Sequence, residues 1–420
     1  MYIKRAEIQN FKGIETMILE FSSGVNLLIG NNGVGKTAVL EALALSIQPY
    51  FYKMSDVIKK SIAKNDVRFV SNLIGNASQH RVYCTPTAIK STILLKETEY
   101  SSEVVKEDET GSTRTKYLGK EISEAGRKLL NSEAVLPVIC YFSTSRVADT
   151  QKTSTSKVGK NKLNDRRCGY MGCLDATLDR KALTDWALKM AMAEYQKGMA
   201  VAEYEAFKKA VGNFMQEMND LDEPPLVEYT RDFEDITYRE NGKTMPVNFL
   251  SAGYQSLLWM LMEICFRNAL LNPGMSDYSK AEGIVLIDEI DMHLHPRWQW
   301  KVLDALHSSF PHLQFIAATH SPIIISSFKD AKLLSIGENG VEELGGAYAY
   351  SIDDVVEYRQ GSSGIPQELR QLKNEFEEAF SERNKEKSQD ALDKMKELFG
   401  ASNTEVKRAE AKMQVRRNWN

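Results

Sequence analysis

Residues 25–47 read VNLLIGNNGVGKTAVLEALALSI. The run Val25–Ile29 is apolar except for Asn26, which is typical of a strand buried on both faces of a parallel sheet. Residues 38–47 have the apolar spacing of a helix, and GNNGVGKT just before them carries the spacing GxxxxGKT. Glycines in such a loop let backbone N–H groups turn toward an anion, and the start of the helix adds partial positive charge. The stretch therefore predicts a strand, a phosphate-binding loop and a helix.

The side chains of this loop have separate expected tasks. Lys36 can reach the β- and γ-phosphates of a nucleotide, and the Thr37 hydroxyl can ligate Mg²⁺. Asn31 and Asn32 are expected to form the turn. The nucleotide-binding residues expected in this stretch are Gly30, Asn31, Asn32, Gly33, Val34, Gly35, Lys36, Thr37 and Ala38.

A second apolar run ends in two acids within residues 282–296, EGIVLIDEIDMHLHP. Carboxylates at the end of a buried parallel strand lie where open α/β sheets place their ligands. Asp288 can hold Mg²⁺, usually through water, and Glu289 can orient or deprotonate a water that attacks phosphorus. Apolar strands that end in acids also occur in core sheets without catalysis, so this reading depends on the loop at residues 30–37.

Two further segments can contribute to an anion site. In LSAGYQS, residues 250–256, Ser251 is expected to cap a helix; alternatively, its hydroxyl, Gly253 and the helix start bind an anion. QFIAATHSP, residues 314–322, reads as a strand that ends in His320. That histidine is expected either to contact a γ-phosphate or to serve a structural role.

A strand at Leu136–Phe142 is followed by Arg146, which could contact phosphate or simply lie on the surface. Residues 150–168 then carry six cations against one acid, and are expected to form either a solvated loop or a contact for nucleic acid or a partner. These cations are Lys152, Lys157, Lys160, Lys162, Arg166 and Arg167. The spacing CGYMGC at residues 168–173 has no second cysteine pair nearby, so zinc is not expected there.

Composition narrows the class of protein. The chain has 420 residues, is 43% hydrophobic and 26% charged, and is long enough for two or three lobes. The net charge of −4 shows that the chain as a whole is not basic, so a binding site for nucleic acid would require a local basic patch. Five scattered cysteines fit a reducing compartment. The charged start is no signal peptide, and Leu257–Phe266 is too short to span a membrane, so a cytoplasmic protein is expected.

The remaining segments give a coarse secondary-structure prediction. Strands are expected at residues 2–21, 82–89 and 91–97, helices at 122–131 and 298–310, and a compact helical insertion at 174–222. Residues 226–250 are expected to form two strands around an Asn241-Gly242 turn, and residues 323–328 and 331–336 more sheet.

The tail from Pro366 reads as charged helices with apolar stripes, and Gly400 is expected to end one of them. Two destinations for the apolar stripes are open. They pack onto the chain's own core, or they dock an effector subunit or extend an oligomer.

Five elements stand in a recognisable order: GNNGVGKT, the strand before Arg146, LSAGYQS, IVLIDEID and ATHSP. Over roughly residues 1–50 and 245–335 the chain resembles the ABC-type ATPases of the SMC, RecF and OLD group. Its compact insertion and short tail resemble the stand-alone ATPases of bacterial anti-phage systems such as Septu. The resemblance implies an α/β fold: an ABC-type P-loop ATPase head with a mixed β-sheet core, a compact helical insertion and a helical C-terminal tail. The implied divisions are 1–149, 150–245, 246–350 and 351–420, with the head formed by the first and third.

The resemblance also implies roles. Glu289 would be the general base and His320 the switch histidine, Thr37 and Asp288 would hold Mg²⁺, and Lys12 would lie near the ATP. Ser251 and Gly253 would bind the ATP of a partner subunit, and Asp291 would lie across the seam of a head-to-tail homodimer or higher homo-oligomer. His293 and His295 suggest a metal, although the HLHP pattern is frequent in the group without one. The usual Q-loop glutamine has no clear position, with Gln151 as one candidate.

The function implied is an ATP-hydrolysing enzyme that senses or engages nucleic acid and controls a separate effector in anti-phage defence. A nuclease on another chain is the expected effector, because no HNH or Toprim-like pattern follows residue 335. Three alternatives are open: a RecF- or SMC-like repair ATPase, the ATPase subunit of a transporter, and a nucleotide-dependent scaffold. The long separation of Lys36 from Ser251 argues against the transporter.

Overall fold

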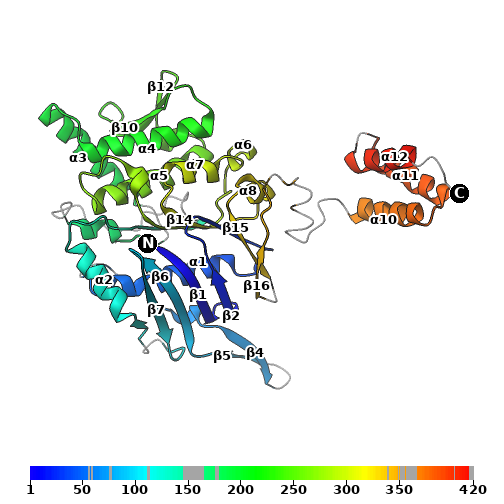
Figure 1. The fold of residues 1–420 in the computed structure, drawn as a ribbon, viewed down its shortest axis with the longest axis horizontal. Coiled ribbons are helices and arrows are strands. Elements are labelled where there is room, and N and C mark those ends of the chain that lie inside the picture. The colour runs from blue at the N-terminus through cyan, green and yellow to red at the C-terminus, as the bar shows by residue number, and fades with distance from the viewer. Residues whose placement is uncertain are drawn as a thin grey trace. The chain divides into compact units, whose positions relative to one another are not determined.

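The apolar run Val25–Ile29 forms β3, a strand inside a six-stranded mixed sheet in the computed structural model of the chain (Figure 1). The structure describes residues 1–54, 57, 60–74, 78–110, 114–144, 165–175, 179–337, 340–348, 350, 355, 367–401 and 403–415. Backbone contacts divide the chain into two compact units, residues 1–350 and 351–420.

The six-stranded sheet has the order β16-β15-β3-β14-β13-β9. Its other strands are β9 (Val138–Phe142), β13 (Gly283–Ile287), β14 (Leu313–Ala318), β15 (Lys332–Gly337) and β16 (Gly340–Leu344). Only β16 runs antiparallel to its neighbour. Every residue of β3, β9, β13 and β14 is buried, as their mainly apolar sequences predict, and the polar residues Asn26 and Gln314 are buried with them. The carboxyl ends of the five parallel strands therefore share one edge.

A second, antiparallel sheet has the order β2-β1-β6-β7-β8. Its strands are β1 (Tyr2–Phe11), β2 (Ile14–Glu20), β6 (Thr87–Leu95), β7 (Thr98–Lys106) and β8 (Lys116–Leu118). Helix α1 (Lys36–Ser46), which follows the glycine-rich loop, contacts β1, β6 and β7 of this sheet and β14 of the other. Packing between two sheets explains why nine of its eleven residues are buried. Helix α2 (Lys120–Leu130) follows β8 in the chain, close to its predicted position.

The predicted strand at residues 82–89 is wrong, because two strands meet within it. β5 (Ser78–Tyr83) pairs with β4 (Phe69–Ile74) in a separate hairpin, while β6 begins at Thr87. Pro86 between them has no N–H to continue a ladder. The β6 strand then runs unbroken through most of the segment predicted as a separate strand.

The helical insertion consists of α3 (Arg180–Lys197) and α4 (Ala202–Asn219), followed by a small sheet. That sheet has three strands rather than the predicted two: β10 (Leu226–Thr230), β11 (Asp235–Glu240) and β12 (Lys243–Pro246). The turn at Asn241-Gly242 joins β11 to β12, as predicted, with both residues at positive φ. Trp186 of α3 packs against Phe266 of α5 (Ala252–Leu271), which ties the insertion to the head.

The segment 323–328, predicted as sheet, is mostly the helix α8 (Pro322–Ser327). The Ser321 hydroxyl oxygen accepts hydrogen bonds from the backbone N–H groups of Ile323 and Ile324, and Pro322 occupies the first turn. A capped start with proline in first position outweighs the strand preference of three isoleucines. The predicted helix at 298–310 is broken into α6 (Pro296–Gln299) and α7 (Val302–Ser309).

In the part of the tail described from residue 367 onward, the chain forms the helices α10 (Gln367–Ser381), α11 (Lys385–Phe399) and α12 (Thr404–Val415). Gly400 ends α11 as predicted. The helices bury part of their apolar stripes against one another, and the two expected destinations, the chain's own head and another subunit, stay predictions. The common core of the helices consists of Leu369, Phe376, Ala391, Leu392, Met395, Val406 and Ala409. Within the described ranges, no helix combines the length and apolar composition needed to cross a membrane.

Candidate functional site

Three chain segments meet at the carboxyl edge of the parallel sheet. The β14 strand lies between β3 and β13 and is parallel to both. The loop at residues 30–37, called the nucleotide loop below, follows β3; Asp288 and Glu289 follow β13; and Thr319 and His320 follow β14. The sheet thus brings the nucleotide loop, the acids and the histidine to one edge.

The three glycines of the nucleotide loop all have positive φ, a conformation that favours glycine. Gly30 has φ of 141°, and a Cβ there would lie 2.3 Å from the carbonyl oxygen of Ile336 on β15. Gly35, at φ 104°, is the residue from which α1 begins. No described side chain caps α1 and no acid lies in its first turn. The first N–H groups of the helix are therefore available to an anion.

Lys36 holds the nucleotide loop closed. Its Nζ donates hydrogen bonds to the carbonyl oxygens of Gly30, at 2.8 Å, and Asn31, at 2.9 Å. Lys36 is 7% exposed, and burial lowers its pKa, while Asp288, Glu289 and Asp291 act to raise it. The cation thus lies within the field of three acids.

Thr37 and Asp288 are in direct contact although 251 residues separate them. The Thr37 hydroxyl donates a hydrogen bond to Asp288 Oδ2 at 2.8 Å, and Asp288 is 2% exposed. A hydroxyl and a carboxylate are both hard oxygen donors, which suit Mg²⁺ bound mainly by phosphate and water. The residues present therefore fit a nucleotide-bound Mg²⁺.

Glu289 and His320 differ in how their surroundings constrain them. Glu289 has a φ of 46°, in the left-handed region, where non-glycine residues are uncommon and often mark functional sites. Burial lowers the pKa of His320, and Lys36 lowers it further, against the opposing effect of Asp291, Glu289 and Asp288. The imidazole is therefore neutral near pH 7. Asp291 also accepts a hydrogen bond from the Thr319 hydroxyl.

Lys12 is held against α1. Its Nζ forms an ion pair with Glu41, one turn after Thr37 on that helix, and lies 3.8 Å from Asp66 Oδ1. Its predicted position near ATP stays a prediction.

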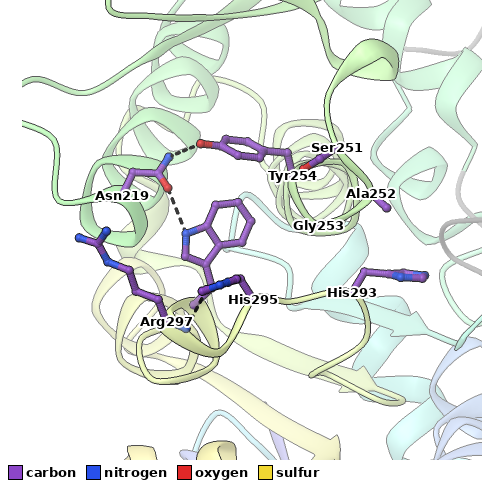
Figure 2. Close-up of a pocket in the computed structure, with 9 residues that line it drawn as sticks. Asn219, Ser251, Ala252, Gly253, Tyr254, His293, His295 and Arg297 are labelled. Atoms are coloured by element: carbon purple, nitrogen blue, oxygen red, sulfur yellow. Dashed lines mark hydrogen bonds between the residues drawn. The ribbon is translucent and has the colours of Figure 1, made fainter.

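Ser251 and Gly253 line a different surface, a pocket of about 500 Å³ (Figure 2). Ser251 is the N-cap of α5 by position, but its side chain makes no capping hydrogen bond. A Cβ on Gly253 would lie 2.7 Å from the carbonyl oxygen of His293, so the start of α5 sits directly against the segment that follows Glu289. The pocket is lined by Asn219, Ser251, Ala252, Gly253, Tyr254, His293, His295, Arg297 and Trp298.

Sequence reasoning did not include Asn219 and Tyr254 among the site residues. Asn219 is the last residue of α4, and no local motif surrounds it. Tyr254 does lie within LSAGYQS, so its neighbourhood was a usable signal. Among the described residues, no group of three or more His, Cys, Asp or Glu could hold a metal ion, and this includes His293 and His295.

Arg146, Gln151 and most of the segment 150–168 lie outside the described residues. The segment's end is described, and there the expectation of a solvated basic loop is wrong. The Arg166 guanidinium donates hydrogen bonds to the carbonyl oxygens of Leu271, Ser132 and Ala134. Arg166 therefore fastens the chain to the end of α5. Its neighbour Arg167 is paired with Asp165.

A profile described as "AAA domain" matches residues 5–224. The chain belongs to this AAA domain family. A second profile, described as "AAA domain, putative AbiEii toxin, Type IV TA system", matches residues 188–326. The family assignment agrees with the glycine-rich loop and the acids at the sheet edge.

Two relatives match much of the chain. A Septu protein PtuA of Bacillus thuringiensis is 25% identical over 421 residues, covering 96% of this chain and 95% of the relative. A protein of Vibrio cholerae serotype O1 biovar El Tor named "Retron Vc95 probable ATPase" is 24% identical over 373 residues, covering 76% of this chain and 71% of the relative.

Among solved structures, an SMC head bound to the C-terminal winged-helix domain of ScpA matches with a TM-score of 0.51 at 15% identity. The match covers 82% of this chain and 98% of that one. The predicted fold class is thereby confirmed: this AAA-domain chain has an α/β fold like that of an SMC head, with a mixed sheet and C-terminal helices.

Proposed function

We propose that this chain binds ATP with Mg²⁺ and hydrolyses it to ADP and phosphate. The observation that carries the proposal is the contact between Thr37 and Asp288, which joins the nucleotide loop to the acidic strand end. Their neighbours Lys36, Glu289 and His320 belong to the same electrostatic cluster. A phosphate loop, a metal-binding pair, a second acid and a neutral histidine are the groups that phosphoryl transfer to water requires.

The residues divide the work as follows. The N–H groups at the start of α1 and the Lys36 ammonium bind the β- and γ-phosphates, while Thr37 and Asp288 hold Mg²⁺. The ion would neutralise charge on the phosphate oxygens. Water attacks the γ-phosphorus and forms a P–O bond, its proton passes to the Glu289 carboxylate, and the bond to ADP breaks. Neutral His320 is suited to a hydrogen bond with the γ-phosphate.

The proposal includes a head-to-tail dimer with two shared ATP sites. The supporting observation is that Ser251 and Gly253 line a pocket with His293, His295 and Arg297, and that no residue of the nucleotide loop lines it. The Ser251 hydroxyl makes no capping hydrogen bond to α5, so the hydroxyl and the start of the helix can together bind a phosphate supplied by another subunit. Two-fold symmetry then places each such surface against the nucleotide loop of the opposite copy.

We further propose that the ATPase acts in anti-phage defence by controlling a separate effector, with a nuclease as the expected partner. The relative that spans nearly the whole chain is a Septu protein, and the other reported relative is named as a probable ATPase of a retron. Nucleic acid is the proposed trigger.

Replacing Glu289 by Gln tests the enzymatic part. Phosphate release should fall roughly 10²–10⁴-fold, because the base is lost while the phosphate contacts remain, and ATP affinity should be retained. Size-exclusion chromatography with ATP should then show an accumulated dimer. Glu282→Gln is the matched control, because Glu282 lies just before β13, the strand that Glu289 follows. This variant should hydrolyse ATP like the wild type. Wild-type turnover by Glu289→Gln would contradict the assignment.

The defence role needs a separate experiment. Cells carrying the chain with its neighbouring genes should restrict phage, and Glu289→Gln should abolish that protection without lowering the amount of protein. If Glu289→Gln instead makes the cells sensitive to DNA damage and leaves phage restriction unchanged, a role in repair is favoured.

A further inference from the structure

The Asn219 amide joins four groups from three elements, two of which, Tyr254 and Trp298, are drawn in Figure 2. Its Nδ2 donates to the Tyr254 hydroxyl at 3.1 Å, the Tyr238 hydroxyl at 3.3 Å and Glu240 Oε2 at 3.4 Å. Its Oδ1 accepts a hydrogen bond from the indole Nε1 of Trp298 at 3.1 Å. The two amide hydrogens are thus shared among three acceptors, and both ends of the amide are hydrogen-bonded.

Ring packing reinforces these hydrogen bonds. The Tyr254 ring meets the Trp298 ring edge-on with centroids 4.7 Å apart, and meets the Tyr238 ring at 5.6 Å. The next residue, Asp220, is the C-cap of α4 and forms ion pairs with Arg297 and Lys301. The end of α4 is therefore attached to α5, to the α6 region and to β11.

The attached groups form two walls of the pocket that contains Ser251. Tyr254 follows Gly253 directly, and a Cβ on Gly253 would lie 3.5 Å from Trp298 Cζ3. Asn219 belongs to the insertion, whereas Tyr254 and Trp298 belong to the head. A hydrogen bond of 3.1 Å does not survive a shift of about 1 Å, so movement of α4 must move these walls or break the contacts.

We propose that Asn219 is a positioning residue, through which the insertion sets the Ser251–Gly253 segment for hydrolysis of ATP held by the opposite subunit. The inference rests on the proposed function and deepens it: it identifies the insertion as the regulatory part and Asn219 as its link. Asn219 touches neither ATP nor the reacting atoms of its own site, so its effect appears in turnover and not in nucleotide affinity.

Asn219→Ala tests the link, with Asn213→Ala as the matched control, because Asn213 lies on the same helix and is exposed. Misplacement of a reacting group by about 1 Å can cost on the order of 10²-fold in rate, so kcat should fall roughly 10- to 100-fold for Asn219→Ala. Affinity for a non-hydrolysable ATP analogue should stay within about twofold of wild type, and the control should match wild type in both. Unchanged kcat in a folded Asn219→Ala protein overturns the inference.

Tyr254→Phe is the milder second variant, which keeps the ring contacts and removes the hydroxyl that Asn219 contacts. A fall of roughly threefold in kcat is expected, with Tyr195→Phe, 90% exposed, as the control. In the double variant, the Tyr254 change should add little to Asn219→Ala, because both remove one link. If the loss of kcat in the double variant equals the product of the two single losses, Asn219 and Tyr254 do not act through one link.

A mixture of Asn219→Ala and Glu289→Gln subunits separates positioning across the dimer from damage within a subunit. One site of the mixed dimer combines the missing base with the displaced Ser251–Gly253 segment, while the other site has neither lesion. With random pairing about half of the dimers are mixed and each has one intact site, so the mixture should reach roughly half the rate of a wild-type and Glu289→Gln mixture, in which wild-type homodimers contribute the rest. A rate no higher than that of Asn219→Ala alone would overturn the inference, whereas a wild-type protein that releases no phosphate would overturn the proposed function itself.

Discussion

Replacing Lys36 by Met removes the cation of the nucleotide loop and keeps most of the side-chain volume. In the structure, Lys36 Nζ donates to two backbone carbonyls and is surrounded by the field of Asp288, Glu289 and Asp291. With ATP bound, the same ammonium would contact phosphate oxygens, and a hydrogen bond to a charged group is worth about 1.5–3 kcal/mol. Such a loss weakens binding roughly 10- to 150-fold. Because Lys36 is only 7% exposed, screening by water is weak, and the upper part of that range is expected.

The free energy of unfolding should change much less than the affinity. The carbonyl of Asn31 belongs to an exposed residue, so water can replace the ammonium as its hydrogen-bond donor. A net loss of about 1 kcal/mol is expected for the two hydrogen bonds, which thermal unfolding followed by circular dichroism would measure.

Isothermal titration calorimetry with a non-hydrolysable ATP analogue and Mg²⁺ measures the affinity. Lys106→Met is the matched control. Lys106, the last residue of β7, is also buried, at 3% exposure, and its Nζ donates a 3.0 Å hydrogen bond to the carbonyl oxygen of Thr110. The control should bind the analogue like wild type. A Kd for Lys36→Met within about twofold of wild type would refute the assignment of the loop.

Three further outcomes follow from the same geometry. Ser251→Arg should abolish hydrolysis and leave nucleotide affinity intact. Mixing Ser251→Arg subunits with Glu289→Gln subunits should restore phosphate release, because one site of the mixed dimer carries both lesions and the other none. A mixture as inactive as its components would rule out shared sites. Burial lowers the pKa of His320 from its ordinary value of 6.5, so the imidazole should stay neutral at pH 7–8. The kcat should therefore be constant over that range and fall only below pH 6.5, as the imidazole protonates. The fall should be absent in His320→Gln. Removal of residues 351–420 should leave the Tm of the remaining chain and its ATP affinity nearly unchanged, because the tail's apolar side chains pack among themselves; a Tm lower by more than about 5 °C in calorimetry would contradict this.

The central elements could be predicted from the sequence because their signals are local. A run of buried apolar residues specifies a strand covered on both faces, and the spacing of glycines before Lys36 specifies a loop that only those residues can form. The β3 strand, the loop and α1 accordingly occur where the pattern placed them. The errors at residues 82–89 and 323–328 arose where proline and a serine cap, acting on single backbone positions, overrode the average preference of a segment.

The tail shows a second limit of local reasoning. Its apolar spacing correctly indicated helices with one buried face. Periodicity states that a face is covered but not by what, and here the three helices cover one another.

The sequence by itself determined the strands β3 and β13, the glycine-rich loop and the identity of the acids and histidine at strand ends, because each depends on neighbours within a few residues. Only the tertiary structure decided that Thr37 contacts Asp288, and that Asn219 contacts Tyr254 and Trp298. Those contacts join side chains from elements far apart in the chain. Their geometry depends on how whole helices and sheets pack, and no periodicity or spacing of residues encodes it.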